Sequence, residues 1–166
     1  MSPSLLLLLA LVGGASADYA VEFGLVGFYN PDGTMFTGQR CDTITSCDTI
    51  ICVEASDTPN DDFGNCYQSE FFSTQRFTNT NTVEFSNGTT YDEWKNPTTY
   101  RYQTSSPYKA LQVKVQVIDK DIFRSYDLIA RLRGLFNAAD YPPGQTHLIA
   151  LKDQANHKLE AYFKVG

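Results

Sequence analysis

The segment from Leu111 to Val117 places the strongest constraint on what this chain can fold into. Apolar residues at 111, 113, 115 and 117 alternate with Gln112, Lys114 and Gln116. A period of two is typical of a strand with one face on a core and the other toward water. The segment therefore predicts a half-buried β-strand, around which the other elements can be arranged.

Acidic residues follow this strand. Asp119 and Asp121 are separated by one residue, and Asp127 comes after a short segment that contains Ile122 and Phe123. Several carboxylates in one loop are unfavourable unless water solvates them, turn amides bind them, or a hard cation gathers them. The loop is a candidate calcium site, and the alternative is a set of aspartates that cap exposed turns.

Further alternating segments predict a single β-rich domain, for which 166 residues are sufficient. Turn signals such as Asn30-Pro31-Asp32-Gly33 separate these segments. Besides the strand described above, we expect strands near residues 21–29, 49–54, 69–77, 82–85, 98–103, 146–151 and 158–165.

The N-terminal segment has the features of a secretory signal peptide. An apolar run from Leu5 to Val12 precedes the small residues Ala15-Ser16-Ala17. We expect residues 1–17 to be removed, so that a secreted, extracellular protein begins near Asp18. The run is too short to span a bilayer.

Four cysteines lie close together in the sequence, at Cys41, Cys47, Cys52 and Cys66. In an exported chain this pattern predicts two disulfides, and three pairings are possible. The C-x-x-C spacing of zinc sites is missing. Asn87-Gly88-Thr89 is a sequence for N-linked glycosylation in an expected turn.

Charge and side-chain chemistry limit the classes of function. The net charge of −6 opposes direct binding to nucleic acid or anionic lipid, although a bound divalent cation would reverse the field locally. The histidines, His147 and His157, are expected at the surface or in turns. We expect no catalytic residues and no enzymatic activity. The sequence leaves the oligomeric state open.

The acidic loop resembles the third calcium-binding loop of C2 domains. The likeness rests on Asp119, Asp121 and the run Asp127-Leu128-Ile129 after a hydrophobic strand. It implies an eight-stranded antiparallel β-sandwich. It also implies that Asp32, before Gly33, and Asp48, before Thr49, supply further calcium ligands from the first loop.

A narrower resemblance covers the first third of the chain. The run from Ala20 to Gly33 and the run from Cys47 to Val53 are similar to the N-terminal C2-type module of Notch ligands of the Delta and Jagged kind. In those ligands a cysteine-rich DSL region and epidermal-growth-factor repeats follow the module. Because this chain ends at Gly166 without them, we do not expect a complete ligand of that kind.

These resemblances imply a secreted, non-enzymatic binding module. The first interpretation is calcium-assisted attachment to phospholipid or a cell surface, with Met35, Phe36, Ile122 and Phe123 in contact with the membrane or partner. The alternative is a calcium-independent protein-interaction module, related to the Notch-ligand N terminus, that modulates a receptor pathway.

Residues 128–136 admit two interpretations. Their apolar residues recur at helical spacing, which favours an amphipathic helix. The resemblance to C2 domains instead implies a strand from Asp127 to about Arg133, followed by an irregular or short helical connection. We take the strand as our prediction.

Overall fold

The structure is a computed structural model that describes residues 19–41, 46–64, 66, 72–74, 76–85, 99–104, 109–120 and 126–166. Within these residues the chain forms nine strands and one short 3-10 helix. They are β1 (Tyr19–Tyr29), β2 (Thr49–Ser56), β3 (Phe72–Ser73), β4 (Thr82–Glu84), β5 (Thr99–Thr104), β6 (Ala110–Asp119), β7 (Asp127–Asn137), η1 (Ala138–Asp140), β8 (Thr146–Lys152) and β9 (Lys158–Val165).

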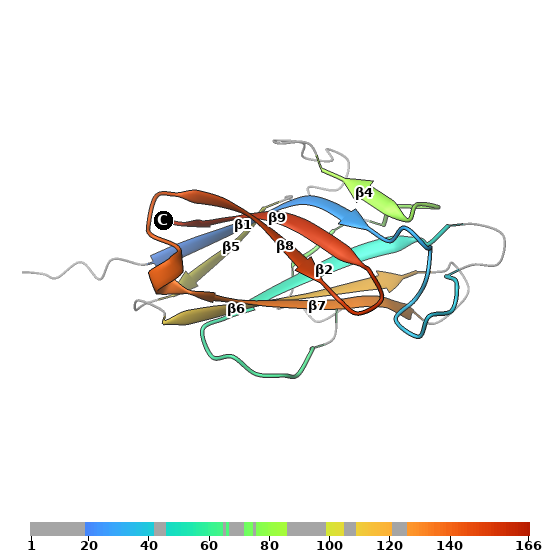
Figure 1. The fold of residues 1–166 in the computed structure, drawn as a ribbon, viewed down its shortest axis with the longest axis horizontal. Coiled ribbons are helices and arrows are strands. Elements are labelled where there is room, and N and C mark those ends of the chain that lie inside the picture. Colours follow the sequence, from blue (N-terminus) through green and yellow to red (C-terminus); the bar gives the residue numbers. More distant parts are fainter. Residues whose placement is uncertain are drawn as a thin grey trace, which may run out of the picture.

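The strands form two antiparallel sheets that pack face to face (Figure 1). One sheet has the order β3-β2-β6-β7, and the other has the order β4-β1-β9-β8 with β5 also paired to β1. β5 pairs with Tyr19–Gly24 of β1, and β4 pairs with Gly27–Tyr29. Since β4 and β5 share one position beside β1, each sheet has four strand positions. The predicted eight-stranded antiparallel β-sandwich is confirmed.

Alternate residues of the long strands supply the core between the sheets. On β6 the fully buried residues of this set are Leu111, Val113, Val115 and Val117. Phe163 of β9 stacks on Phe136 of β7, with 4.6 Å between ring centroids. Burying a large apolar side chain stabilises a fold by about 1.5–3 kcal/mol. The alternation read from the sequence therefore directs one face of each strand into a shared core.

Residues 128–136 are strand, as predicted. β7 pairs with β6 from Asp119↔Asp127 to Ala110↔Asn137, and the short helix η1 follows it. Leu135, which helical spacing would place with the other apolar residues, points outward and is 56% exposed. Pairing with β6 satisfies the β7 backbone and decides between the two interpretations. The strand expected near residues 69–77 is described only at Phe72–Ser73.

The two predicted disulfides are present, and the structure selects their pairing. Cys41 bonds to Cys47, with Cα atoms 5.2 Å apart, and Cys52 bonds to Cys66, with Cα atoms 5.6 Å apart. Both separations suit a disulfide. The second bridge holds Cys66 against the outer face of the β2-β6 pair, where a small cluster includes Ile118.

Several connections meet at one end of the sandwich, which we call the loop pole. It consists of the 30–41 turn, the segment Cys47–Thr49, the 77–82 turn, and the paired ends of β6 and β7. Gly33 allows the first turn, because its φ is +60° and a Cβ there would lie 2.7 Å from Asn81 Nδ2. Asp48, Asp119 and Asp127, three of the acids expected to bind calcium, lie at this end, and Asp32 lies in its first turn.

We expect Phe163→Ala to lower the free energy of unfolding by about 3–5 kcal/mol, because it removes a ring from a fully packed core. Chemical denaturation at equilibrium measures this loss. Leu148→Ala is the control, since Leu148 is 63% exposed and its truncation should cost less than about 0.5 kcal/mol. Equal losses from the two changes would contradict the assigned core.

Candidate functional site

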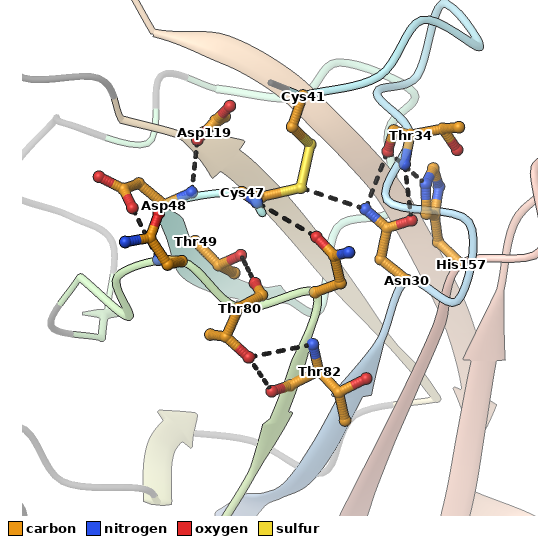
Figure 2. The surroundings of a disulfide bond; sticks show 12 residues. Asn30, Thr34, Cys41, Cys47, Asp48, Thr49, Thr80, Thr82, Asp119 and His157 are labelled. Carbon is orange, nitrogen blue, oxygen red and sulfur yellow. Dashed lines mark hydrogen bonds between the residues drawn. A yellow bond between two sulfur atoms is a disulfide. The ribbon is translucent and has the colours of Figure 1, made fainter. Parts of the chain in front are cut away.

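Asn30 ties the first turn of the loop pole to the start of β2 (Figure 2). It is 1% exposed, and its side-chain amide donates to Thr34 O at 2.9 Å and to Cys47 Sγ at 3.5 Å. Its Oδ1 accepts from Thr34 N at 3.0 Å. Cys47 N in turn donates to Asn81 Oδ1 at 3.1 Å. One buried amide thus fixes the turn beside the disulfide.

Two of the predicted calcium ligands, Asp48 and Asp119, lie together at the centre of the loop pole. Asp48 N donates to Asp119 Oδ1 at 2.6 Å (Figure 2). Lys120 N donates to Asp48 O at 2.9 Å. Both aspartates are buried, with exposed fractions of 8% and 2%. Acids from two separate loops therefore meet here, as the resemblance to C2 domains implied for these two residues.

The Asp48 carboxylate is bound by groups of the protein itself. Its Oδ1 accepts from Asn79 N at 2.8 Å, and its Oδ2 lies 3.6 Å from Arg76 Nη1. Asn79 adopts a φ of 52°, a conformation that asparagine tolerates better than most residues. No motif in the sequence pointed to Arg76, because it lies far from the acidic loop in the chain.

The other predicted ligands do not complete a metal site in the described part of the chain. Asp127 pairs with Asp119 across the β6-β7 ladder, whereas Asp32 is exposed in the first turn. Among the described residues, no group of three or more histidine, cysteine, aspartate or glutamate side chains is placed to hold a metal ion. Asp121 lies outside these residues.

A calcium ion needs roughly six to eight oxygen ligands. The acids that the structure describes do not fit that requirement, because Asp48 and Asp119 accept backbone hydrogen bonds and Arg76 lies beside Asp48. Carboxylates in such positions hold loops together. The full set, which includes Asp121, stays a prediction.

The apolar residues expected to touch a membrane or partner are only partly described. Phe36 is 49% exposed, and its N donates to Leu128 O at 3.0 Å, which holds the first turn against β7. Met35 is half-buried beside it. Ile122, Phe123 and the glycosylation residue Asn87 lie outside the described residues, and so does the predicted signal peptide.

His157 is a turn residue, which agrees with the prediction of a surface or turn position, but its side chain is buried. It lies in the turn before β9 and is 0% exposed. Its Nδ1 lies 2.7 Å from Asp153 Oδ2, and its Nε2 lies 3.0 Å from Thr34 O. The ring therefore joins the β8-β9 turn to the first turn. Asp153, four residues earlier, was the only signal for this role.

A polar cluster lies on the outer face of the β1-β9 pair. Lys158 Nζ forms an ion pair with Glu160, and Tyr29 donates from its hydroxyl to Glu160 Oε2 at 3.3 Å. The hydrogen bond from Lys158 lowers the pKa of Glu160, whereas desolvation and the nearby carboxylate raise the pKa of Tyr29. Such exposed pairs contribute little to stability.

No helix among the described residues has both the length and the apolar character needed to cross a membrane. No protein-family model matches this sequence, and no curated protein does either.

Comparison with solved structures does give similar folds. A C2 domain protein from Ramazzottius varieornatus has a TM-score of 0.72 and 21% identity, over 89% of this chain and 88% of that chain. Human GIVD cytosolic phospholipase A2 has a TM-score of 0.61 and 15% identity, and this chain covers 17% of its length. A Drosophila C2-DSL-EGF1 structure has a TM-score of 0.53 and 18% identity, over 89% of this chain and 67% of that chain.

These likenesses establish the fold. The chain has the fold of C2 domains, as the resemblance of its acidic loop implied. The similarity to the C2-DSL-EGF1 structure agrees with the resemblance to the N-terminal module of Notch ligands at the level of fold. Fold alone does not assign a ligand or an activity.

We expect Asp119→Ala to lower the free energy of unfolding by about 1–3 kcal/mol, because the buried Asp48 N–H loses its acceptor. Urea denaturation at equilibrium measures the change. Asp32→Ala removes a carboxylate from an exposed position and should leave stability unchanged. A neutral effect of Asp119→Ala would show that this hydrogen bond does not hold the loops.

Proposed function

We propose that this protein is a secreted, non-enzymatic binding module that engages a cell-surface protein through its loop pole without calcium. The observation that carries the proposal is the occupation of Asp48 and Asp119 by backbone N–H groups, with Arg76 beside Asp48. These contacts hold the loops in place, so no metal ion is needed to order them.

The two disulfides support an extracellular location. Two disulfides are present, and such bonds are stable mainly in oxidising compartments. The apolar segment at residues 1–17 would direct export, and a glycan on Asn87 would be compatible with it. The predicted relation to the Notch-ligand module supports a protein partner on a cell surface.

A second candidate is calcium-assisted attachment to phospholipid. The exposure of Phe36 at the loop pole favours it, because an aromatic ring at a loop tip can enter a membrane interface. The fold is also similar to part of a human phospholipase A2. In this candidate, Asp121 and Asp127 would bind the ion with the other predicted acids.

Calcium titration by calorimetry on the oxidised protein separates the candidates. We expect no saturable binding of calcium at millimolar concentration. The positive charge of Arg76 already balances the negative charge of the Asp48 carboxylate, which the ion would need. Arg76→Ala should create weak calcium binding at Asp48. Arg133→Ala is the matched control, since it removes an arginine whose carboxylate partner, Asp61, lies outside the loop pole.

Sedimentation with anionic phospholipid vesicles, with calcium and with a chelator, completes the test. We expect the protein to stay in the supernatant in both conditions. Saturable calcium binding together with calcium-dependent sedimentation, both lost in Asp119→Asn with Asp121→Asn, would overturn the proposal in favour of the second candidate.

A further inference from the structure

A groove of about 750 Å³ runs along β7, beside the loop pole. Four separate segments form its walls, so it is assembled by the fold rather than by one loop. Its polar and aromatic lining comprises Phe36 of the first turn, Asp61 and Phe63 of the 57–64 loop, Arg131 and Arg133 of β7, and Lys152 to Gln154 at the β8-β9 turn.

Buried polar residues fix two of these walls. His157 joins the β8-β9 turn to the first turn through Asp153 Oδ2 and Thr34 O, at 2.7 and 3.0 Å. Because that first turn carries Phe36, one buried ring sets the separation of two sides of the groove. A site whose walls are held in this way needs little ordering when a ligand binds.

The 57–64 loop is fixed in the same manner. Lys114 of β6 is 3% exposed, and its Nζ donates to Asn60 Oδ1 and Asp62 O. Its ammonium also lies 5.9 Å from the centroid of the Phe63 ring. Lys114 therefore holds the loop, with Phe63, over the outer face of the sheet.

Cations predominate in the groove, although the protein as a whole carries a net charge of −6. The Arg131 guanidinium lies over Phe63, with its Cζ 5.4 Å from the ring centroid. In the described part of the chain, no carboxylate forms an ion pair with Arg131 or Lys152. Asp153 lines the groove, but its carboxylate is bound to His157.

The remaining cation has a partner that a ligand can replace. Arg133 forms an ion pair with Asp61, and the two side chains are 56% and 88% exposed. Exposed ion pairs of this kind contribute little free energy. An anionic group that binds both Arg133 and Arg131 would displace Asp61 at small cost, because guanidinium groups bind carboxylate, sulfate and phosphate oxygens in pairs.

We propose that this groove binds an anionic saccharide of one or two rings that carries sulfate or carboxylate groups. Phe36, which is 49% exposed, offers an apolar ring at one side of the groove, and such a ring suits the C–H face of a sugar. Arg131, Arg133 and Lys152 bind the anionic groups. A short ligand fits better than a long polyanion, because the net charge of −6 on the protein opposes the binding of additional negative charge.

Calorimetry with a sulfated uronic acid–glucosamine disaccharide tests the proposal, with the same disaccharide lacking sulfate as the reference. We expect binding of the sulfated form only, weakened by added salt. Arg131→Gln with Lys152→Gln should reduce the affinity about tenfold or more. Asp61→Asn should increase it by up to about fivefold, because the competing carboxylate is gone.

Lys109→Gln with Lys164→Gln is the matched control, because it removes two positive charges from positions that do not line the groove. It should leave the affinity unchanged. Circular dichroism and thermal denaturation confirm that each variant is folded. Three results would overturn the proposal: no binding at millimolar disaccharide, an equal loss in the control, or binding of inositol phosphates and anionic vesicles in place of the saccharide.

Discussion

The loop pole depends on one buried segment, Cys47–Thr49, through which the surrounding loops are hydrogen-bonded to one another. Asp48 N is held by the Asp119 carboxylate at the end of β6, and the Asp48 carboxylate holds Asn79 N in the opposite turn. Thr49 pairs its backbone with Phe77. A buried polar group without a partner costs about 1–3 kcal/mol. The loops must therefore keep these positions for the segment to stay buried.

Two further buried polar residues, His157 and Lys114, fix loops outside the loop pole. Lysine is almost never fully buried in proteins, and here Asn60 and Asp62 of a distant loop retain Lys114. His157 is fully buried as well, and it is retained by Asp153 and by Thr34 of the distant first turn. His157 fixes the β8-β9 turn and Lys114 fixes the 57–64 loop. The groove along β7 thus has walls whose positions are set from within the fold.

A protein can have the fold of C2 domains without using its strand-end acids to bind a metal ion. Carboxylates at the ends of β-strands can gather a metal ion, but they can also bind the amides of neighbouring loops. In the described residues, Asp48 and Asp119 do the second, with Arg76 as a local positive charge. The same scaffold can then present its loops and its groove without a metal ion.

Local alternation of apolar and polar residues was enough to predict the strands, and the resemblance to C2 domains implied the sandwich. Alternation at residues 111–117 and 158–165 sets which face of each strand is apolar, and that choice is local because side chains on a strand alternate. That Asp48 and Asp119 meet at one end was implied by the resemblance to C2 domains, and alternation within the strands does not predict it.

The remaining features depend on contacts between separate segments of the folded chain. The disulfide pairing, the strand at residues 128–136, and the contacts of Arg76 and His157 all depend on which segments lie side by side. The periodicity of one segment does not show which other segment it contacts. Hydrogen bonds and disulfides form between residues that are close in the folded protein, whatever their separation in the sequence. The meeting of Arg131 with Phe63 across the groove is decided in the same way.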